Sequence, residues 1–312
     1  MPEVHYRGRV RQIPVYIRKF FRIFIYMDDW KVLPMSALIA WLVSFAIGGS
    51  MFANMEGTLK GSLALTCVCI WNGFFNSIQA VCRERGVLKR EHRAGLHMSS
   101  YIAAHMVYQA AICLAQAMVT VAVCRISGLS FPSSSVFTGF FMLDIAIVFF
   151  LITYSADMMA LFVSSMAHST TQAMTLMPFI LIFELLFSGG VFALDGFSDW
   201  LSYITIARWG MCAIAAVSGY NSLPMVTAWN QMKNMQEYEY SGMYPIRSFV
   251  ENIEMNGSVD DFCYQTASYN LRPEYASTAE NISTCLSALI IFSLVFAFLA
   301  VVVLEKIDKD RR

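Results

Sequence analysis

Two acidic residues lie inside long apolar stretches, where an ionised side chain is costly and its presence therefore informative. Asp144 lies in the apolar run 133–156, and Glu184 lies in the run 170–194. A carboxyl in such a place either takes part in proton or cation transport or forms a buried hydrogen bond to a neighbouring helix. The second interpretation is favoured by about two to one. In both cases the side chains are expected to face protein or water.

The sequence contains no motif for nucleotide binding or metal binding. The Gly-x-x-x-x-Gly-Lys-Ser/Thr loop that cradles nucleotide phosphates is absent, so this chain is not expected to bind ATP in that manner. The five histidines show neither a His-x-x-x-His pair nor a Cys-x-x-Cys partner, so no metal site is expected. We therefore expect no catalytic residue and no cofactor on this chain.

Composition narrows the class of protein. Hydrophobic residues make up 57% of the 312 residues and charged residues 14%, against roughly 45–50% and about 25% in soluble domains. This excludes a water-soluble globule. The charges of the 22 basic and 22 acidic residues cancel, so the protein has no net electrostatic field that would attract nucleic acid.

The elements that must position these carboxylates are membrane helices. A helix needs about 20 apolar residues to cross a hydrocarbon core about 30 Å thick. Six runs of about this length predict an all-α integral membrane protein with six transmembrane helices. The runs are 33–53, 61–82, 99–124, 133–156, 170–194 and 285–304.

The distribution of Lys and Arg predicts the orientation of these helices. Basic residues near a span are retained on the cytoplasmic side. With both termini cytoplasmic, sixteen of the 22 Lys and Arg residues fall on the inner side, in segments 7–31, 83–93 and 306–312. The short link 157–169 is then also on the inner side. We expect a multi-pass protein of the cell (cytoplasmic) membrane.

A seventh apolar stretch, 200–217, would reverse the orientation of the tail if it crossed the membrane. It contains Arg208 and follows the turn-like sequence 195–199. We interpret it as a re-entrant segment that enters the outer leaflet and is covered by protein.

Four regions follow from this topology. Residues 1–32 form a cytoplasmic tail with an amphipathic helix at 11–27, whose Arg and Lys side chains suit the lipid headgroups. Residues 33–194 hold the first five spans. Residues 195–284 hold the re-entrant segment and a large outer loop with ten acidic and four basic residues, and 285–312 hold the last span and a cytoplasmic tail.

The segment 83–97 is the most charged part of the interior of the chain, with five Lys or Arg and two Glu residues. Mixed charges at helical spacing predict a short cytoplasmic helix that meets a partner protein. A solvated turn that only enforces topology is the alternative.

Two segments resemble the White, or G-subfamily, of ATP-binding cassette exporters, the type V exporters. The first is Glu84-Arg-Gly-Val-Leu-Lys-Arg-Glu91, followed by Gly95 and Ser99-Ser-Tyr101. The second is Phe187-Ser-Gly-Gly-Val191, followed by Trp200-Leu-Ser-Tyr-Ile-Thr-Ile-Ala-Arg-Trp209 and Asn221. The amphipathic helix, six spans and large last outer loop occur in the same order in that family.

The resemblance implies the permease half of an exporter. Two such halves pair as a homodimer or heterodimer, and each docks on a nucleotide-binding ATPase that holds ATP and Mg. ATP-driven closure then moves an amphipathic or hydrophobic substrate outward by alternating access. The ATPase is expected on a separate chain, which is the usual bacterial arrangement.

The resemblance also assigns roles to three groups of residues. The ATPase-coupling group is Glu84, Arg85, Arg90 and Glu91, with 11–27 as the connecting helix. The substrate-pathway group is Trp71, Asn72, Phe75, Ile182 and Leu185. The gate positions, which hold a Leu pair in the drug-exporting member, are Gly190 and Val191 here.

Two other functions remain open. One is a proton- or ion-coupled secondary transporter that uses Asp144 and Glu184, although such folds often contain internal repeats and we find none. The other is a membrane receptor or assembly protein that binds its partner through the acidic outer loop.

Overall fold

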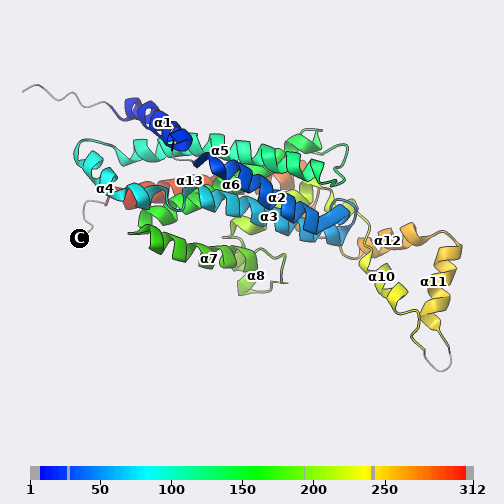
Figure 1. The fold of residues 1–312 in the computed structure, drawn as a ribbon. Coiled ribbons are helices and arrows are strands. Elements are labelled where there is room, and N and C mark those ends of the chain that lie inside the picture. The colour runs from blue at the N-terminus through cyan, green and yellow to red at the C-terminus, as the bar shows by residue number, and fades with distance from the viewer. Residues whose placement is uncertain (1–7, 27–28, 193, 240–242, 307–312) are drawn as a thin grey trace, which may run out of the picture.

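The computed structural model describes residues 8–26, 29–192, 194–239 and 243–306, and these form a long helical bundle with a small helical lobe at one end (Figure 1). The expected tail residues 1–7 and 307–312, which include four of the basic residues counted on the inner side, lie outside the described residues. The bundle helices are α1 (Arg9–Tyr26), α2 (Val32–Ile47), α3 (Met55–Ser77), α4 (Ala80–Arg93), α5 (Met98–Ile126), α6 (Phe141–Met166), α7 (Thr170–Leu186), α8 (Phe197–Ser202), α9 (Ile206–Val217) and α13 (Ala279–Leu304).

Among the residues that the structure describes, five helical segments are long and apolar enough to cross a membrane. They are Asp29–Ser50, which contains α2, Met55–Arg93, which joins α3 and α4, and the helices α5, α6 and α13. Helices α7 and α9 are apolar but shorter. The chain is therefore an all-helical, multi-pass membrane protein. The sixth span, expected at 170–194, stays a prediction that depends on α7.

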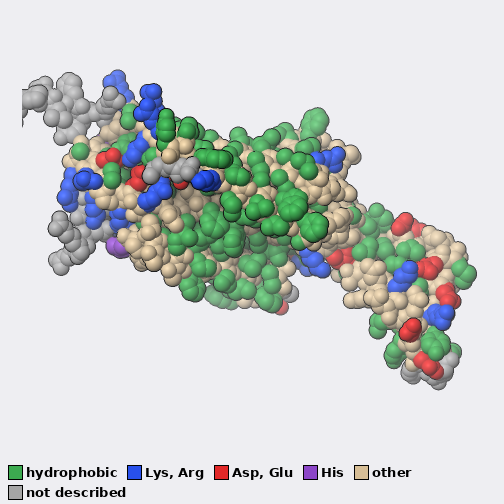
Figure 2. Space-filling model, viewed as in Figure 1, with side chains coloured by type: hydrophobic (Ala, Val, Ile, Leu, Met, Phe, Trp, Pro, Cys, Tyr) green, Lys and Arg blue, Asp and Glu red, His purple; other side chains and the backbone are tan. Residues whose placement is uncertain are grey.

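Helix α6 forms the centre of the bundle. In its apolar segment 78% of the residues are buried, against 17% in the segment that contains α2 and 28% in α13. Helices α3, α5, α9 and α13 all pack against α6, and hydrophobic side chains cover the visible outer surface of the bundle (Figure 2). Apolar groups therefore fill the interior and also cover the surface, as expected for a protein surrounded by lipid.

The contact between α3 and α6 requires a glycine. A Cβ atom added to Gly73 would lie 2.3 Å from the carbonyl oxygen of Thr153 and 2.7 Å from the backbone nitrogen of Asp157. Small residues allow two membrane helices to approach this closely, so that dispersion forces act over a long contact. Gly73 therefore sets the distance between the two helices.

The expected boundaries of the fourth span are wrong. The sequence interpretation places this span at 133–156, whereas α6 begins at Phe141 and continues to Met166. Pro132, three serines and Gly139 precede the helix and favour turns over a helix start. As a consequence Asp157, which was expected in an inner link, lies within α6 and is fully buried.

The region expected to form a re-entrant segment and an ordered outer domain folds into two parts. Helix α9 is buried along almost its whole length within the bundle. Helices α10 (Thr227–Asn234), α11 (Pro245–Met255) and α12 (Val259–Ser268) form the protruding lobe (Figure 1). Trp229, Val250 and Cys263 form the small core of this lobe.

The expected amphipathic helix is present as α1. It begins at Arg9 and ends at Tyr26, and it packs along α5. Phe20 is its buried residue and stacks on His105 of α5, with ring centroids 4.0 Å apart. Lys and Arg side chains gather at the end of the bundle where α1 and α4 lie (Figure 2).

The close approach at Gly73 predicts the effect of a single methyl group. Gly73→Ala should lower the stability of the purified chain by about 1–3 kcal/mol, because the backbone of α6 must move away. Gly86→Ala in α4 is the matched control: its added Cβ meets nothing within 4 Å, and alanine favours a helix over glycine by about 1 kcal/mol. Thermal unfolding in detergent measures both. Equal melting temperatures for the two variants would contradict the assigned role of Gly73.

Candidate functional site

A cavity of about 430 Å³ lies between α3 and α7. Apolar and sulfur-containing side chains make up most of its wall, and Glu184 and the backbone of α9 close one side. The lining residues are Cys67, Ile70, Trp71 and Phe75 from α3, Met174, Met177, Pro178, Leu181, Ile182, Glu184 and Leu185 from α7, and Ala207 from α9.

Helical spacing brings these side chains to one face. Residues four apart lie one above the other on a helix, and this spacing relates Cys67, Trp71 and Phe75 on α3. The rings of Trp71 and Phe75 are in contact, with centroids 5.7 Å apart. Trp71 is 45% exposed and Ile182 is 54% exposed, so the cavity opens on the outer surface of the single chain.

The structure brings together four of the five residues that the resemblance assigns to the substrate pathway. Trp71, Phe75, Ile182 and Leu185 all line the cavity. Asn72 is not among the lining residues; it is buried, and its Nδ2 has no hydrogen-bond partner among the described residues. Their contact with a substrate stays a prediction.

Glu184 connects α7 to the start of α9. Its Oε2 accepts a hydrogen bond from the backbone nitrogen of Ala207 at 2.8 Å. The first backbone N–H groups of a helix lack partners within the helix and carry partial positive charge, so a carboxylate is stabilising there. Thr205 is the N-cap residue, and its hydroxyl accepts from the backbone nitrogen of Arg208 at 3.4 Å.

Asp144 also has local partners. It lies in the first turn of α6, where its carboxylate accepts hydrogen bonds from the hydroxyl of Thr138 at 2.5 Å and the backbone nitrogen of Thr138 at 3.2 Å. Glu184 thus bonds to a neighbouring helix, whereas Asp144 bonds to Thr138 in the segment just before its own helix.

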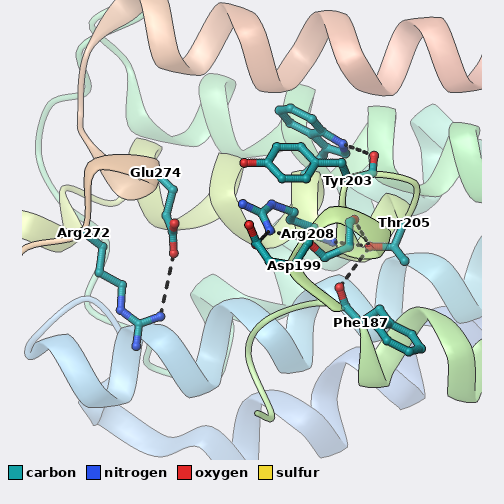
Figure 3. A network of polar contacts seen from close by, with 9 residues as sticks. Phe187, Asp199, Tyr203, Thr205, Arg208, Arg272 and Glu274 are labelled. Atoms are coloured by element: carbon teal, nitrogen blue, oxygen red, sulfur yellow. Dashed lines mark hydrogen bonds and ion pairs between the residues drawn. The ribbon is translucent and has the colours of Figure 1, made fainter. Parts of the chain in front are cut away.

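A polar network around Arg208 joins α8 to α9 (Figure 3). The Nη1 atom of Arg208 lies 2.6 Å from Oδ1 of Asp199 and also donates to the hydroxyl of Ser202. The guanidinium lies over the ring of Tyr203, 3.9 Å from its centroid. The Arg208 charge thus has an acidic partner and an aromatic face, which explains how it is tolerated in an apolar stretch.

The same network reaches the end of α7. The hydroxyl of Thr205 lies 3.3 Å from the carbonyl oxygen of Phe187, just past this helix, and the indole nitrogen of Trp209 donates to the carbonyl oxygen of Tyr203 at 3.0 Å. The sequence analysis used Arg208 only as evidence on topology. In the sequence, the nearby opposite charges of Asp199 and Arg208 were the one signal from which this network could have been inferred.

The gate positions Gly190 and Val191 lie in the turn that follows α7, outside the lining of the α3–α7 cavity. A Cβ on Gly190 would lie 2.7 Å from Sδ of Met211 and 3.2 Å from Cδ1 of Leu63. The absence of a side chain here lets this turn pack on α9 and α3. A gating role for the two residues stays a prediction.

Helix α4, which contains the expected coupling residues, is tied to α1. The ammonium group of Lys19 lies 3.3 Å from Oε2 of Glu84 and 3.7 Å from Oε1 of Glu91. The Tyr16 hydroxyl donates to Oε2 of Glu91 at 2.9 Å. Burial, together with this hydrogen bond, raises the pKa of Tyr16 well above its usual value, so the phenol keeps its proton at physiological pH.

Helix α4 is also tied to the C-terminal end of α6. Arg85 donates to the carbonyl oxygens of Ser165 and Ala167, both at 2.9 Å, and the Ser164 hydroxyl accepts from the backbone nitrogens of Val81 and Cys82. Arg90 differs from these residues: it is exposed and forms no ion pair with any residue that the structure describes. The expected helix at 83–97 is confirmed as Ala80–Arg93.

The helical bundle, the cavity on its α3–α7 face and the charged helices at one end define a membrane transport protein. Residues 11–219 match the family model of the ABC-2 type transporter, and the chain belongs to that family as its membrane component. The match covers α1 to α9.

A relative supports this assignment. The chain is 30% identical over 158 residues to the ABC transporter ATP-binding/permease protein Rv1747 of Mycobacterium tuberculosis. The match covers 47% of this chain and 17% of the relative. The chain thus spans less than a fifth of the length of that curated relative.

The position of Glu184 predicts different results for two substitutions. Glu184→Gln retains an oxygen that accepts from Ala207 and should change stability little, whereas Glu184→Leu leaves the α9 N–H group without a partner, at a cost of about 1–3 kcal/mol. Melting temperatures of the two purified variants measure this difference. If the leucine variant is as stable as the glutamine variant, the hydrogen bond does not hold α9.

Proposed function

We propose that this chain is the permease of an ATP-driven exporter that moves an amphipathic or hydrophobic molecule outward by alternating access. The observation that carries the proposal is the apolar cavity between α3 and α7, open on one face of an ABC-2 membrane component. Pockets that bind apolar ligands have such walls with few polar groups. The one carboxylate in the lining, Glu184, is occupied by the start of α9.

We further propose that a second permease half covers the open face. Large apolar side chains are exposed on α3 and α7, namely Trp71, Phe75, Phe179 and Ile182. In a two-fold dimer each half would supply the same surface, and the two cavities would face each other across the axis. The substrate pathway would then run along the dimer interface.

The proposed topology has six spans, with both termini on the cytoplasmic side. Helix α7 has 17 residues, a length of about 26 Å, slightly less than the hydrocarbon core of about 30 Å. Helices α8 and α9 would form the re-entrant segment, with the lobe of α10 to α12 outside. The excess of Lys and Arg at the α1–α4 end supports this orientation.

A nucleotide-binding ATPase is the proposed partner at the inner end, where it would supply ATP and Mg. The name of the mycobacterial relative combines ATP-binding and permease functions. Helix α4 fits a coupling role because it contacts α1 through Glu84 and Glu91 and contacts α6 through Arg85. The resemblance of 84–91 and 187–209 to White, or G-subfamily, exporters supports the same assignment.

Secondary transport through Asp144 and Glu184 has less support. Asp144 accepts hydrogen bonds on both carboxylate oxygens and Glu184 accepts one on Oε2, so both carboxylates already make local contacts. The acidic outer lobe alone does not favour a receptor, since it leaves the α3–α7 cavity without a role.

Two Trp–Phe pairs provide a matched test of the dimer. Trp71 contacts Phe75 on α3 with tilted rings, and Trp41 stacks on Phe45 on α2 with centroids 6.1 Å apart. The two tryptophans are 45% and 50% exposed. In a Cys67→Ser background, Trp71→Cys should give dimers with a bifunctional thiol reagent in native membranes. Trp41→Cys should not, because α2 would face lipid. Equal crosslinking of the two variants would rule out the α3–α7 face as the interface.

The exposed charge of Arg90 provides a test of ATPase docking. Purification of the chain from its native membrane, followed by mass spectrometry, should recover an ATPase in stoichiometric amount. Arg90→Glu should reduce that recovery by about tenfold or more, because it reverses the charge of an exposed residue on the helix proposed to dock. Arg247→Glu, on the outer lobe, is the control and should have no effect. Recovery of the unaltered chain without an ATPase, even after crosslinking, would count against the exporter.

A further inference from the structure

Asp157 is a buried carboxyl that the proposed transport cycle does not use. It lies in α6, 13 residues after Asp144, or about 20 Å further along the helix axis. Its side chain is 0% exposed, neither carboxyl oxygen forms a hydrogen bond of good geometry with a described residue, and the Ser77 hydroxyl is the polar group beside it. Asp144 and Glu184 both form such hydrogen bonds, so of these three carboxylates Asp157 is the unpaired one.

The surroundings of Asp157 supply no positive charge. On α3, Gly73 meets its backbone nitrogen and the hydroxyl of Ser77 lies beside its carboxyl. Asp157 interacts electrostatically with three ionisable side chains, all uncharged at neutral pH. They are Cys113 and Tyr108 of α5 and Tyr154 of α6 itself.

Of the other helices packed against α6, α9 contains Arg208, whose charge pairs with Asp199. Helix α4 contains Arg85, which donates to the carbonyl oxygens of Ser165 and Ala167. On α13 the ionisable residues within the helix are Glu280 and Cys285, near its outer end. Among the described residues, no Lys or Arg contributes to the electrostatics of Asp157. An isolated carboxylate in such a place is so costly that the group becomes neutral by taking up a proton.

A path leads from the inner side of the bundle toward Asp157. A second cavity, of about 210 Å³, lies between α1, α3, α4 and α5. Asp29 and Arg83 lie at its charged end, and Gln109 lines it deeper in the bundle. The amide nitrogen of Gln109 donates to the hydroxyl of Ser77 at 2.8 Å, and that hydroxyl lies beside the carboxyl of Asp157.

We propose that Asp157 is a proton-binding site that exchanges its proton with water entering from this cavity past Gln109 and Ser77. One proton binds to a carboxylate oxygen, and no covalent or redox step is involved. The cluster also contains a buried acceptor without a hydrogen-bond partner among the described residues, the amide oxygen of Gln109.

The location of the site gives the proton a structural effect. Asp157 lies where Gly73 brings α3 onto α6. Loss of the proton would leave a negative charge inside this contact, and water or a cation would have to enter to solvate it. Proton binding therefore favours the tightly packed arrangement of α3 and α6.

Infrared spectroscopy of the full chain in lipid vesicles tests the proton directly. A protonated carboxyl has a carbonyl stretching band that an ionised carboxylate lacks. The wild-type spectrum at neutral pH should contain such a band, and Asp157→Asn should remove it. The same band should persist in Asp144→Asn, the matched variant from the same helix. A spectrum that Asp157→Asn leaves unchanged would show that Asp157 is ionised and would overturn the proposal.

Deuterium exchange tests the path. The Asp157 band should shift when the vesicles are transferred to heavy water, and Gln109→Leu should slow this shift because it removes the link to Ser77. Thr120→Val is the control on α5: its hydroxyl bonds to the carbonyl oxygen of Gln116, and it does not line the inner cavity. Equal exchange rates in the two variants would refute the path through Gln109. These measurements need neither substrate nor ATPase, so their result is independent of the exporter proposal.

Discussion

The close approach of α3 to α6 is the contact around which the rest of the bundle is arranged. Within lipid there is little hydrophobic force between helices, so association depends on packing and on polar contacts inside the protein. Gly73 allows the backbone of α3 to reach that of α6, and α5, α9 and α13 then pack around the pair. The outer face of α3 is left to form the α3–α7 cavity. Trp71 and Phe75 of α3 line that cavity.

The sequence predicted the helical class well because long apolar runs have few alternatives in a membrane. It failed at the start of α6, where 133–140 is apolar enough to continue a span but consists of residues that favour turns. Because the expected span began and ended too early, Asp157 was assigned to a loop and was not recognised as a buried carboxyl. Hydropathy alone could not correct this error, because it measures how apolar a segment is and does not show at which residue the helix begins.

The candidate site was predictable only in part, for a similar reason. Trp71, Phe75, Ile182 and Leu185 share one cavity, as the family resemblance suggested. Lys19 pairs with Glu84 and Glu91, which lie 65 or more positions away in the sequence. A local sequence pattern cannot predict ion pairs over such a separation. The role of Glu184 at the start of α9 also depends on a tertiary contact. Residue type showed that these groups needed partners, but only the fold shows which ones they have.

The two ties between α7 and α9 have a mechanical consequence. Glu184 holds the backbone of Ala207, and Thr205 reaches the carbonyl of Phe187, so the wall of the cavity and the buried helix behind it are joined at two points. If α7 tilts, these two hydrogen bonds would therefore move the start of α9 with it. Displacement at the cavity would thus reach α9, which also packs on α3 and α6.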